Sequence, residues 1–112
     1  MSRLSQSIDN SIILILRRVA RFICRKLKIS VKSVKVMDKK DPLYSTTFGY
    51  NTGGSIKIRL RDCDTNRHYS ITFLIETLVH EIIHQLHFKH SKSFYKKYAQ
   101  TLKMVRRELC QI

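Results

Sequence analysis

Hydrophobic residues recur along the chain with the spacing of helices in three places. From about residue 7 to residue 28 one apolar stripe returns every three or four positions, and Ser7 or Asp9 is placed to cap its start. A second helix is predicted from a Ser70 cap to about His87, and a third after a break near residues 88–91. The predicted buried positions are Ile8, Ile12, Ile15, Val19, Ile23 and Leu27; Leu74, Leu78, Ile82 and Leu86; Phe94, Tyr98, Leu102, Val105 and Leu109.

Two segments alternate with the period of a strand. Residues 29–36 alternate with one phase slip, which predicts a strand with a bulge near Lys32 and Ser33. Residues 55–61 form the cleanest alternation, with apolar side chains facing the core and basic ones facing solvent. The region 43–51 is irregular, with room for a short strand around residues 44–48. The order helix, strand, strand, helix, helix predicts an α+β fold in one domain over residues 1–112, with a small antiparallel or mixed sheet.

Composition places the chain among globular proteins of reducing compartments. Its 112 residues are 43% hydrophobic, which excludes a disordered chain. The three cysteines lie far apart without a CxxC pair, so a disulfide scaffold is not expected. The longest apolar run, residues 12–16, is too short for a secretory signal or a membrane span. We therefore expect a soluble, intracellular, non-secreted protein.

A large positive charge is the second global feature. The 22 Lys and Arg residues outnumber the 8 Asp and Glu residues, which gives a formal charge of +14. Such a charge in a small domain indicates a polyanion partner, and we expect nucleic acid. The alternatives are a solvated charged surface without a ligand and, more weakly, an anionic membrane. The abundance of Ile and Lys over Ala and Gly is typical of an AT-rich genome, such as that of a large DNA virus or its host.

The strongest chemical signal is the HExxH pattern of residues 80–84 on the second predicted helix. At about 100° per residue, His80 and His84 lie about 40° apart on one face and one turn apart, so both imidazoles reach one metal ion. Glu81 projects beside them, where a carboxylate can take a proton from a metal-activated water. The alternative is a helix with two surface histidines and a solvated Glu, but the apolar neighbours would bury both sides of such a helix.

A catalytic zinc needs a third protein ligand. The candidates are His87, His90, His68, Glu108 and Cys110. His87 shares the helix face but lies about 10 Å along the axis from His80, too far for one ion with bonds of about 2 Å. His90 follows a non-helical segment that can turn back under the metal, so it is the favoured ligand.

Residues 49–61 and 76–95 together resemble the WLM-domain metalloproteases, relatives of the SprT/Spartan proteases. The shared pattern begins with Gly-x-Asn-x-Gly-Gly, a basic strand and an acidic-Thr pair. It continues with HExxH, another His at position 87, the family's third metal-binding His at position 90, and an aromatic pair four residues later. The family's Gly-Pro before the third His is Phe88-Lys89 here, and its acidic residue after that His is Ser91. The third-His spacing also equals that of metzincins, but their required Gly is His87 and no Met-turn is evident.

This resemblance implies a compact zincin-like (SprT-like) fold and zinc-dependent peptide hydrolysis. It implies one Zn²⁺ held by His80, His84 and His90, with Glu81 as general base. It also implies substrates that are proteins bound or crosslinked to DNA, and hence an action in the nucleus or wherever DNA lies. Together with the basic surface, the resemblance implies DNA as a partner, either single-stranded or bound without sequence specificity. Two alternatives stay open: a nucleic-acid-binding module without catalysis, and a zinc hydrolase with a non-protein substrate.

Three further roles complete the expected site. The strand Ser55, Ile56, Lys57, Ile58 and Arg59 would form the edge of the cleft and pair with an extended substrate; the alternative is an ordinary edge strand protected by its charges. Glu76, four residues before His80, would orient that imidazole. Tyr95 or Tyr98 would stabilise the oxyanion, and the sequence does not choose between them.

Overall fold

The computed structural model describes residues 3–110, which form three helices and one three-stranded sheet. The elements are α1 (Arg3–Leu27), β1 (Ser33–Val36), β2 (Gly49–Thr52), β3 (Ser55–Ile58), α2 (Ile71–Ile83) and α3 (Lys92–Cys110). The sheet order is β1-β3-β2, with β3 parallel to β1 and antiparallel to β2. The predicted α+β class and mixed sheet are confirmed. The additional strand, β2, follows the 44–48 segment that we considered for it.

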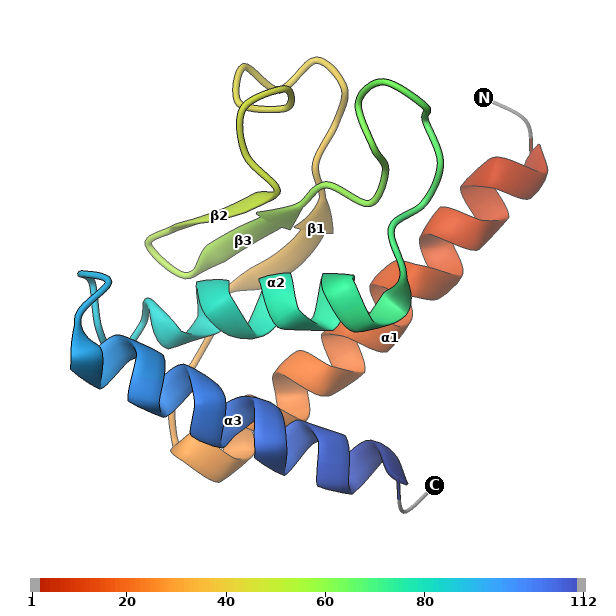
Figure 1. Ribbon diagram of the computed structural model, residues 1–112. Helices are drawn as coiled ribbons and strands as arrows, with labels where there is room; N and C mark the ends of the chain where they lie inside the picture. Colours follow the sequence, from red (N-terminus) through yellow and green to blue (C-terminus); the bar gives the residue numbers. More distant parts are fainter. Residues whose placement is uncertain (1–2, 111–112) are drawn as a thin grey trace.

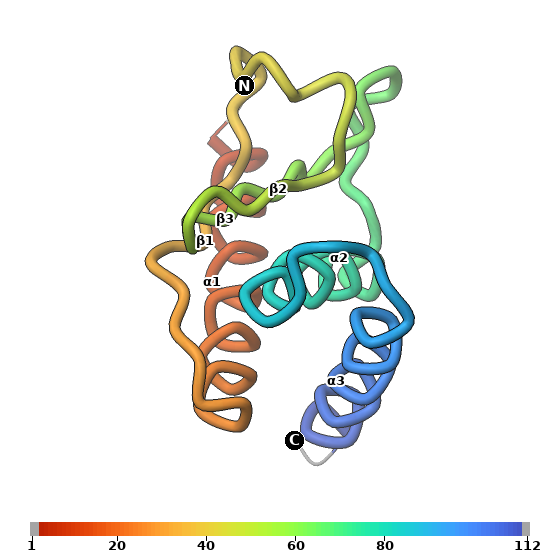
Figure 2. The backbone as a smooth tube through the Cα atoms, turned by 90° about the vertical axis from the view of Figure 1, so that its left-hand side faces the viewer, coloured from red at the N-terminus to blue at the C-terminus, as the bar shows by residue number. Residues whose placement is uncertain are grey.

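The helices lie along one side of the sheet (Figure 1). Helix α1 packs against β1, α2 packs against β2 and β3, and α3 packs against α2. Figure 2 shows α1 and α3 on opposite sides of α2, so that α2 is the central helix. No helix within residues 3–110 has the length and apolar character needed to span a bilayer.

The buried stripe of α1 differs from the predicted one. Its buried residues are Ile13, Leu16, Val19, Ala20 and Ile23. Ile8 and Ile15 are 41% and 42% exposed, so the prediction was wrong for these two positions. Every residue from 12 to 16 is apolar, so periodicity alone does not determine which of them faces the core. The helix also begins before the predicted caps, at Arg3, and Asp9 lies inside it.

Strand β1 begins at the predicted irregularity. The backbone N–H groups of Lys32 and Ser33 both point at the carbonyl of Gly54, at 2.8 and 3.4 Å. Two successive donors on one acceptor are typical of a local bulge in strand pairing. The regular strand therefore covers only the second half of the predicted segment.

The two arginines at the end of the β3 region are internal, contrary to the prediction of outward basic side chains. Arg59 is 6% exposed and lies against the rings of Tyr44, Phe48 and Tyr69, with its carbon Cζ 5.0–5.8 Å from their centroids. Its guanidinium donates to the Tyr44 carbonyl and, at 2.8 Å, to the Tyr69 hydroxyl. Burial is possible because the cation is held by aromatic faces and hydrogen bonds.

Arg61 is buried through charge pairing. It is 5% exposed and donates to Asp9 at 3.1 Å, and Asp9 also contacts His68 at 2.6 Å. Asp9 thus joins α1 to the loop 62–69 instead of capping the helix. Strand alternation does not continue past Ile58, because the chain leaves the sheet there.

Helix α2 starts as predicted and ends early. The Ser70 side chain accepts the backbone N–H of Phe73 at 3.2 Å, which confirms the predicted cap. The helix ends at Ile83 instead of His87, so Leu86 lies beyond it and is 40% exposed. Leu109, near the end of α3, is 39% exposed, so it is not the core residue predicted.

Candidate metal centre

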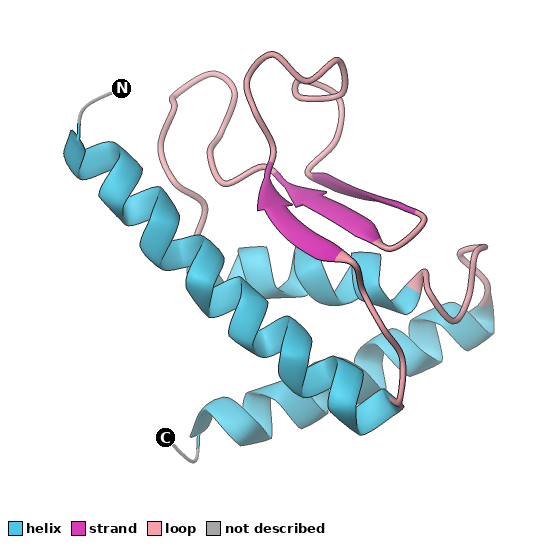
Figure 3. Ribbon diagram, turned by 180° about the vertical axis from the view of Figure 1, so that it is seen from behind, coloured by secondary structure: helices cyan, strands magenta, loops and turns pink. Residues whose placement is uncertain are grey.

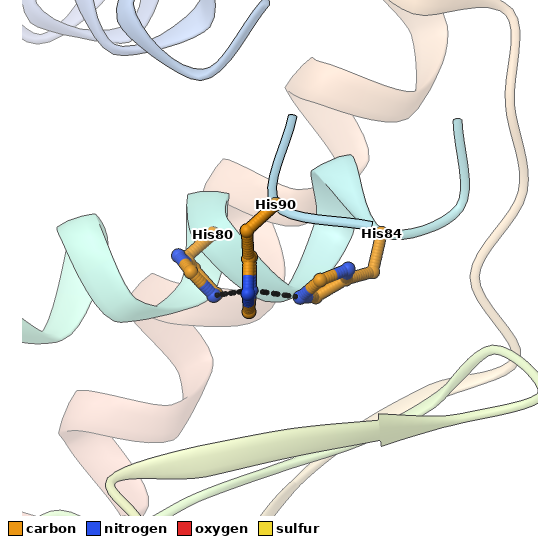
Figure 4. A group of neighbouring side chains, drawn as sticks. All are labelled: His80, His84 and His90. Atoms are coloured by element: carbon orange, nitrogen blue, oxygen red, sulfur yellow. Dashed lines mark hydrogen bonds between the residues drawn. The ribbon is translucent and has the colours of Figure 1, made fainter. Parts of the chain in front are cut away.

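Three imidazoles meet at the C-terminal end of α2. His80 projects from α2, His84 is the residue that directly follows the helix at its C-cap, and His90 comes from the segment that joins α2 to α3 (Figure 4). The Nε2 atom of His90 lies 3.1 Å from Nε2 of His80 and 3.0 Å from Nε2 of His84. Within residues 3–110, these three residues are the group of potential ligands close enough to share one ion.

The distances between these nitrogens fit a zinc site. Zn–N bonds of about 2.0–2.1 Å at tetrahedral angles separate ligand nitrogens by about 3.3 Å. Each nitrogen of a neutral imidazole carries either one N–H or one lone pair, so a single linear hydrogen bond pairs His90 Nε2 with only one of the two ring nitrogens that it faces. A donor set of three imidazole nitrogens is one that Zn²⁺ prefers.

The protonation states also suit metal binding. Burial, together with the proximity of His84 and His90, lowers the pKa of His80 to about 4, so that ring is neutral at pH 7. The Nδ1 atom of His84 lies 3.1 Å from the backbone carbonyl of His87. A proton on Nδ1 would donate to that carbonyl and leave Nε2 as the free ligand atom. His87 thus contacts the site through its backbone.

The ring of Phe94 packs against all three imidazoles. Its ring is fully buried and its centroid lies 4.7–5.0 Å from the centroids of His80, His84 and His90. Packed aromatic contacts restrict ring rotation, so the nitrogens are held in place by packing. The sequence predicted Phe94 only as a core residue.

His90 is positioned by the start of α3. The Ser91 hydroxyl accepts the backbone N–H of Phe94 at 3.2 Å, which makes Ser91 the cap of that helix. The chain reverses without the family's Gly-Pro pair: His87 N–H donates to the Ile83 carbonyl, and Ser91 N–H to the Lys89 carbonyl. The tight connection therefore forms with other residues, and Ser91 serves as a helix cap.

Glu81 lies beside the triad and is largely removed from solvent. Its residue is 8% exposed, and burial raises the pKa of its carboxyl group to about 7. It lines a cavity of about 270 Å³ together with His80, Glu76 and Tyr98. A buried carboxylate beside potential ligands, open to a cavity, has the position of a general base.

The structure separates the two tyrosine candidates. Tyr98 is half-buried and lines the cavity with His80 and Glu81. Burial, and then the charge of Glu76, raises the pKa of its phenol, so it stays a protonated donor at neutral pH. Tyr95 is 53% exposed and stacks on His90 at 6.2 Å outside this cavity.

Glu76 lies in the same cavity, but it does not bond to the ring that it was expected to orient. No hydrogen bond within residues 3–110 joins Glu76 to His80. The four-residue spacing does bring the two side chains to one face of α2. Glu76 acts instead on Tyr98, because its negative charge raises the pKa of that phenol.

The sequence analysis assigned no role to Asn51, whose side chain links the end of α2 to the sheet by hydrogen bonds. Its amide donates to the Glu81 carbonyl at 2.8 Å and to the Gln85 side chain at 2.9 Å, and its oxygen accepts Gly54 N–H. Because the N–H of Gln85 bonds to the Ile82 carbonyl, the Glu81 carbonyl receives its donor from the sheet. The Gly-x-Asn-x-Gly-Gly pattern was the available signal.

The predicted substrate strand is wrong in its position. Strand β3, with Ser55, Ile56, Lys57 and Ile58, is the central strand, so both of its edges already pair with neighbours. Arg59, the last residue of that prediction, is buried. Strands β1 and β2 are the two edge strands, and the chain at the start of β2, residues 47–49, lines the cavity beside Glu81.

The remaining ligand candidates lie elsewhere. His68 contacts Asp9. Glu108 lies between α1 and α3 beside Arg25, and Cys110 is exposed at the end of α3.

Comparisons with known proteins identify similar folds and a matching family. The fold is similar to crystal structures of Wss1 from Saccharomyces cerevisiae, with a TM-score of 0.78, 20% identity and coverage of 90% of this chain and 80% of that one. A mutant of the same protein gives a TM-score of 0.82 at 19% identity, with 95% and 84% coverage. A Wss1 mutant from S. pombe gives 0.71 at 23% identity, with 90% and 86% coverage. No curated protein sequence matches the chain.

A family model, the WLM domain, matches residues 5–111. This match covers nearly the whole chain, which therefore belongs to the WLM domain family.

Proposed function

We propose that this protein is a zinc-dependent metallopeptidase that cleaves proteins bound or crosslinked to DNA. The carrying observation is the meeting of three Nε2 atoms beside a buried carboxylate at the edge of a cavity. A purely structural zinc site has four protein ligands and no use for Glu81. Three ligands and an adjacent carboxylate are the parts that hydrolysis requires.

The division of roles follows from the positions of the side chains. His80, His84 and His90 would hold one Zn²⁺, which supplies an acidified water and polarises a carbonyl when it is bound. Glu81 accepts the proton of the attacking water and returns it to the leaving amine nitrogen. Its burial favours both proton transfers, because a carboxylate shielded from bulk water interacts more strongly with the proton that it carries.

The cavity wall supplies the other contacts that hydrolysis needs. The phenol of Tyr98 donates a hydrogen bond to the oxygen that gains charge as the peptide carbonyl is attacked. The segment 47–49 and the edge strand β2 border the same cavity, where an extended substrate can lie along the edge. This assigns to β2 the role that the sequence assigned to β3.

The DNA part of the proposal rests on charge and on the family resemblance. A formal charge of +14 favours binding to phosphate-rich polymers. Binding to DNA raises the local concentration of proteins attached to it, which favours their cleavage over that of free proteins. We accordingly expect the protein to act in the compartment that holds DNA.

Zinc content and cleavage test the proposal together. We expect one zinc per chain in the wild-type protein, and loss of stoichiometric zinc in His90→Ala. Glu81→Gln should keep its zinc and cleave a histone substrate about 10³-fold more slowly. Glu108→Gln, a matched change on the exposed end of α3, should keep full activity. A wild-type rate in Glu81→Gln would sink the mechanism and favour a binding module.

A further inference from the structure

A cavity lined only by neutral and cationic side chains lies between α1 and β1. It has a volume of about 480 Å³ and is formed by α1, β1 and the segment that joins them. Arg17 and Arg21 line it from the helix, and Lys32 and Lys35 line it from the strand side. We name this cavity with its four cations the α1–β1 groove. Figure 3 views the molecule from this side, with β1 and the joining segment beside α1.

The groove lies in the most one-sided charge region of the chain. Residues 10–37 hold eight basic residues and no acidic one: Arg17, Arg18, Arg21, Arg25, Lys26, Lys28, Lys32 and Lys35. None of the three ion pairs within residues 3–110 uses a cation of this region. Mutual repulsion among these cations is relieved by an anionic partner.

The other basic cavities contain acids. The two cavities between α1 and α3 both include Glu108, and the cavity beside the 38–40 turn includes Asp9 and Asp38. A carboxylate in the lining weakens the attraction of a phosphate. Charge complementarity therefore favours the α1–β1 groove over these surfaces.

Two features equip the groove to contact a phosphodiester backbone. Nε of Arg17 donates to the Val34 carbonyl at 2.8 Å, which fixes the guanidinium while its terminal nitrogens have no other hydrogen bond within residues 3–110. A fixed guanidinium binds phosphate with little further ordering. The hydroxyls of Ser30 and Ser33 add neutral donors along the same wall.

We propose that the α1–β1 groove binds the sugar–phosphate backbone of nucleic acid. No aromatic side chain lines the groove, so base stacking is absent and binding does not depend on sequence. Figure 2 shows α1 and β1 on one side of α2 and α3 on the other, and the segment that carries His90 runs from the end of α2 to α3. A strand in this groove therefore leaves the metal centre open to a protein chain. This inference rests on the DNA part of the proposed function and gives it a location.

A charge-reversal experiment tests the location. Arg21→Glu/Lys32→Glu changes two exposed groove residues, and Lys39→Glu/Lys40→Glu makes the same charge change at two exposed residues flanked by Asp38 and Asp41. Both are made in zinc-loaded Glu81→Gln protein, and the probe is a mixed-sequence single-stranded DNA oligonucleotide. The groove pair should weaken binding at least about tenfold at 0.1 M salt and reduce the slope of log K against log salt by about 1.4. The control pair should change affinity less than about threefold.

Equal losses from the two pairs would overturn the groove as a site and leave only diffuse charge. The groove pair in an otherwise wild-type background should retain full zinc content and full cleavage of a short peptide. This result separates the groove from the metal centre, because failure of the peptidase proposal would show in the peptide assay and not in DNA binding.

A chemical footprint gives an independent measurement. The half-buried thiol of Cys24 lines the groove, whereas Cys63 is exposed in a distant loop. The oligonucleotide should slow alkylation of Cys24 and leave Cys63 unchanged; unaltered alkylation of Cys24 at saturation would contradict the proposal. Equal protection by polyglutamate, or by phosphatidylserine vesicles, would overturn the assignment to nucleic acid.

Discussion

The two ends of α2 are held by different kinds of interaction. At its start, Ser70 caps the helix and the ring of Phe73 packs 5.1 Å from Phe48 and 4.9 Å from Tyr69. At its end, the fixed points are the Asn51 amide and the imidazoles that meet His90. Aromatic packing dominates at the first end, whereas the second end adds the directional Asn51 contacts to the packing of Phe94 against the imidazoles. Changes at the first end should therefore affect folding, and changes at the second end should affect chemistry.

The largest effect that sharpens this comparison is expected at the catalytic end. Tyr98→Phe removes one hydroxyl from the cavity beside Glu81 and should lower kcat about 10²-fold with little change in KM or melting temperature. Steady-state kinetics on a peptide substrate provide the measurement. Tyr95→Phe is the matched control and should keep its rate. A reversed result would assign the oxyanion to Tyr95.

Next in size is an effect on stability at the other end. Arg59→Leu leaves the Tyr69 hydroxyl and the Tyr44 carbonyl without their donor, and should lower the free energy of unfolding by about 2 kcal/mol. Denaturant unfolding measures this change, and Arg67→Leu at an exposed loop position is the control. A wild-type stability for Arg59→Leu would mean that the buried cation only balances its own desolvation.

Asn51→Ala tests whether the catalytic end also contributes to folding. The loss of the amide leaves the Glu81 carbonyl without its donor from the sheet, so we expect about 1.5 kcal/mol lower stability together with weaker zinc binding. Thr52→Ala, at the exposed neighbouring residue, is the control. Unchanged zinc affinity with lower stability would make Asn51 a folding residue and blur the distinction between the ends.

The smallest effect is expected from the helix cap. Ser70→Ala should cost about 1 kcal/mol of stability and leave zinc content and kcat unchanged. Thermal unfolding and elemental analysis of the same sample measure both quantities. Any loss of zinc in this variant would show that the two ends are coupled along α2.

Local patterns predicted the features that depend on neighbouring residues. The Ser70 cap, the start of α3 after the break at residues 88–91, and the shared face of His80 and His84 each follow from spacing within one short segment. His90 was favoured because a bent segment could reach the ion and a straight helix could not. In each case the relevant distance in space is set by the backbone of a short segment.

Features that depend on distant residues were missed or reversed. Alternation places Arg59 on one face of a strand but does not tell whether rings from residues 44, 48 and 69 cover that face. The central place of β3 depends on β2, whose residues Gly49–Thr52 carry no strand pattern. Asn51 acts across 30 positions in the sequence, a separation at which no periodic signal operates.

The origin of His90 outside α2 has a consequence for how the centre responds to metal supply. If residues 84–91 must become ordered when zinc binds, the free energy of ordering lowers the zinc affinity. By linkage, bound zinc stabilises the ordered segment by the same amount. Phe88-Lys89 lacks the backbone restriction that a proline would impose, so more of this order has to come from the ion. At the proposed zinc site, the fraction of molecules in which residues 84–91 are ordered should therefore rise with the free zinc concentration.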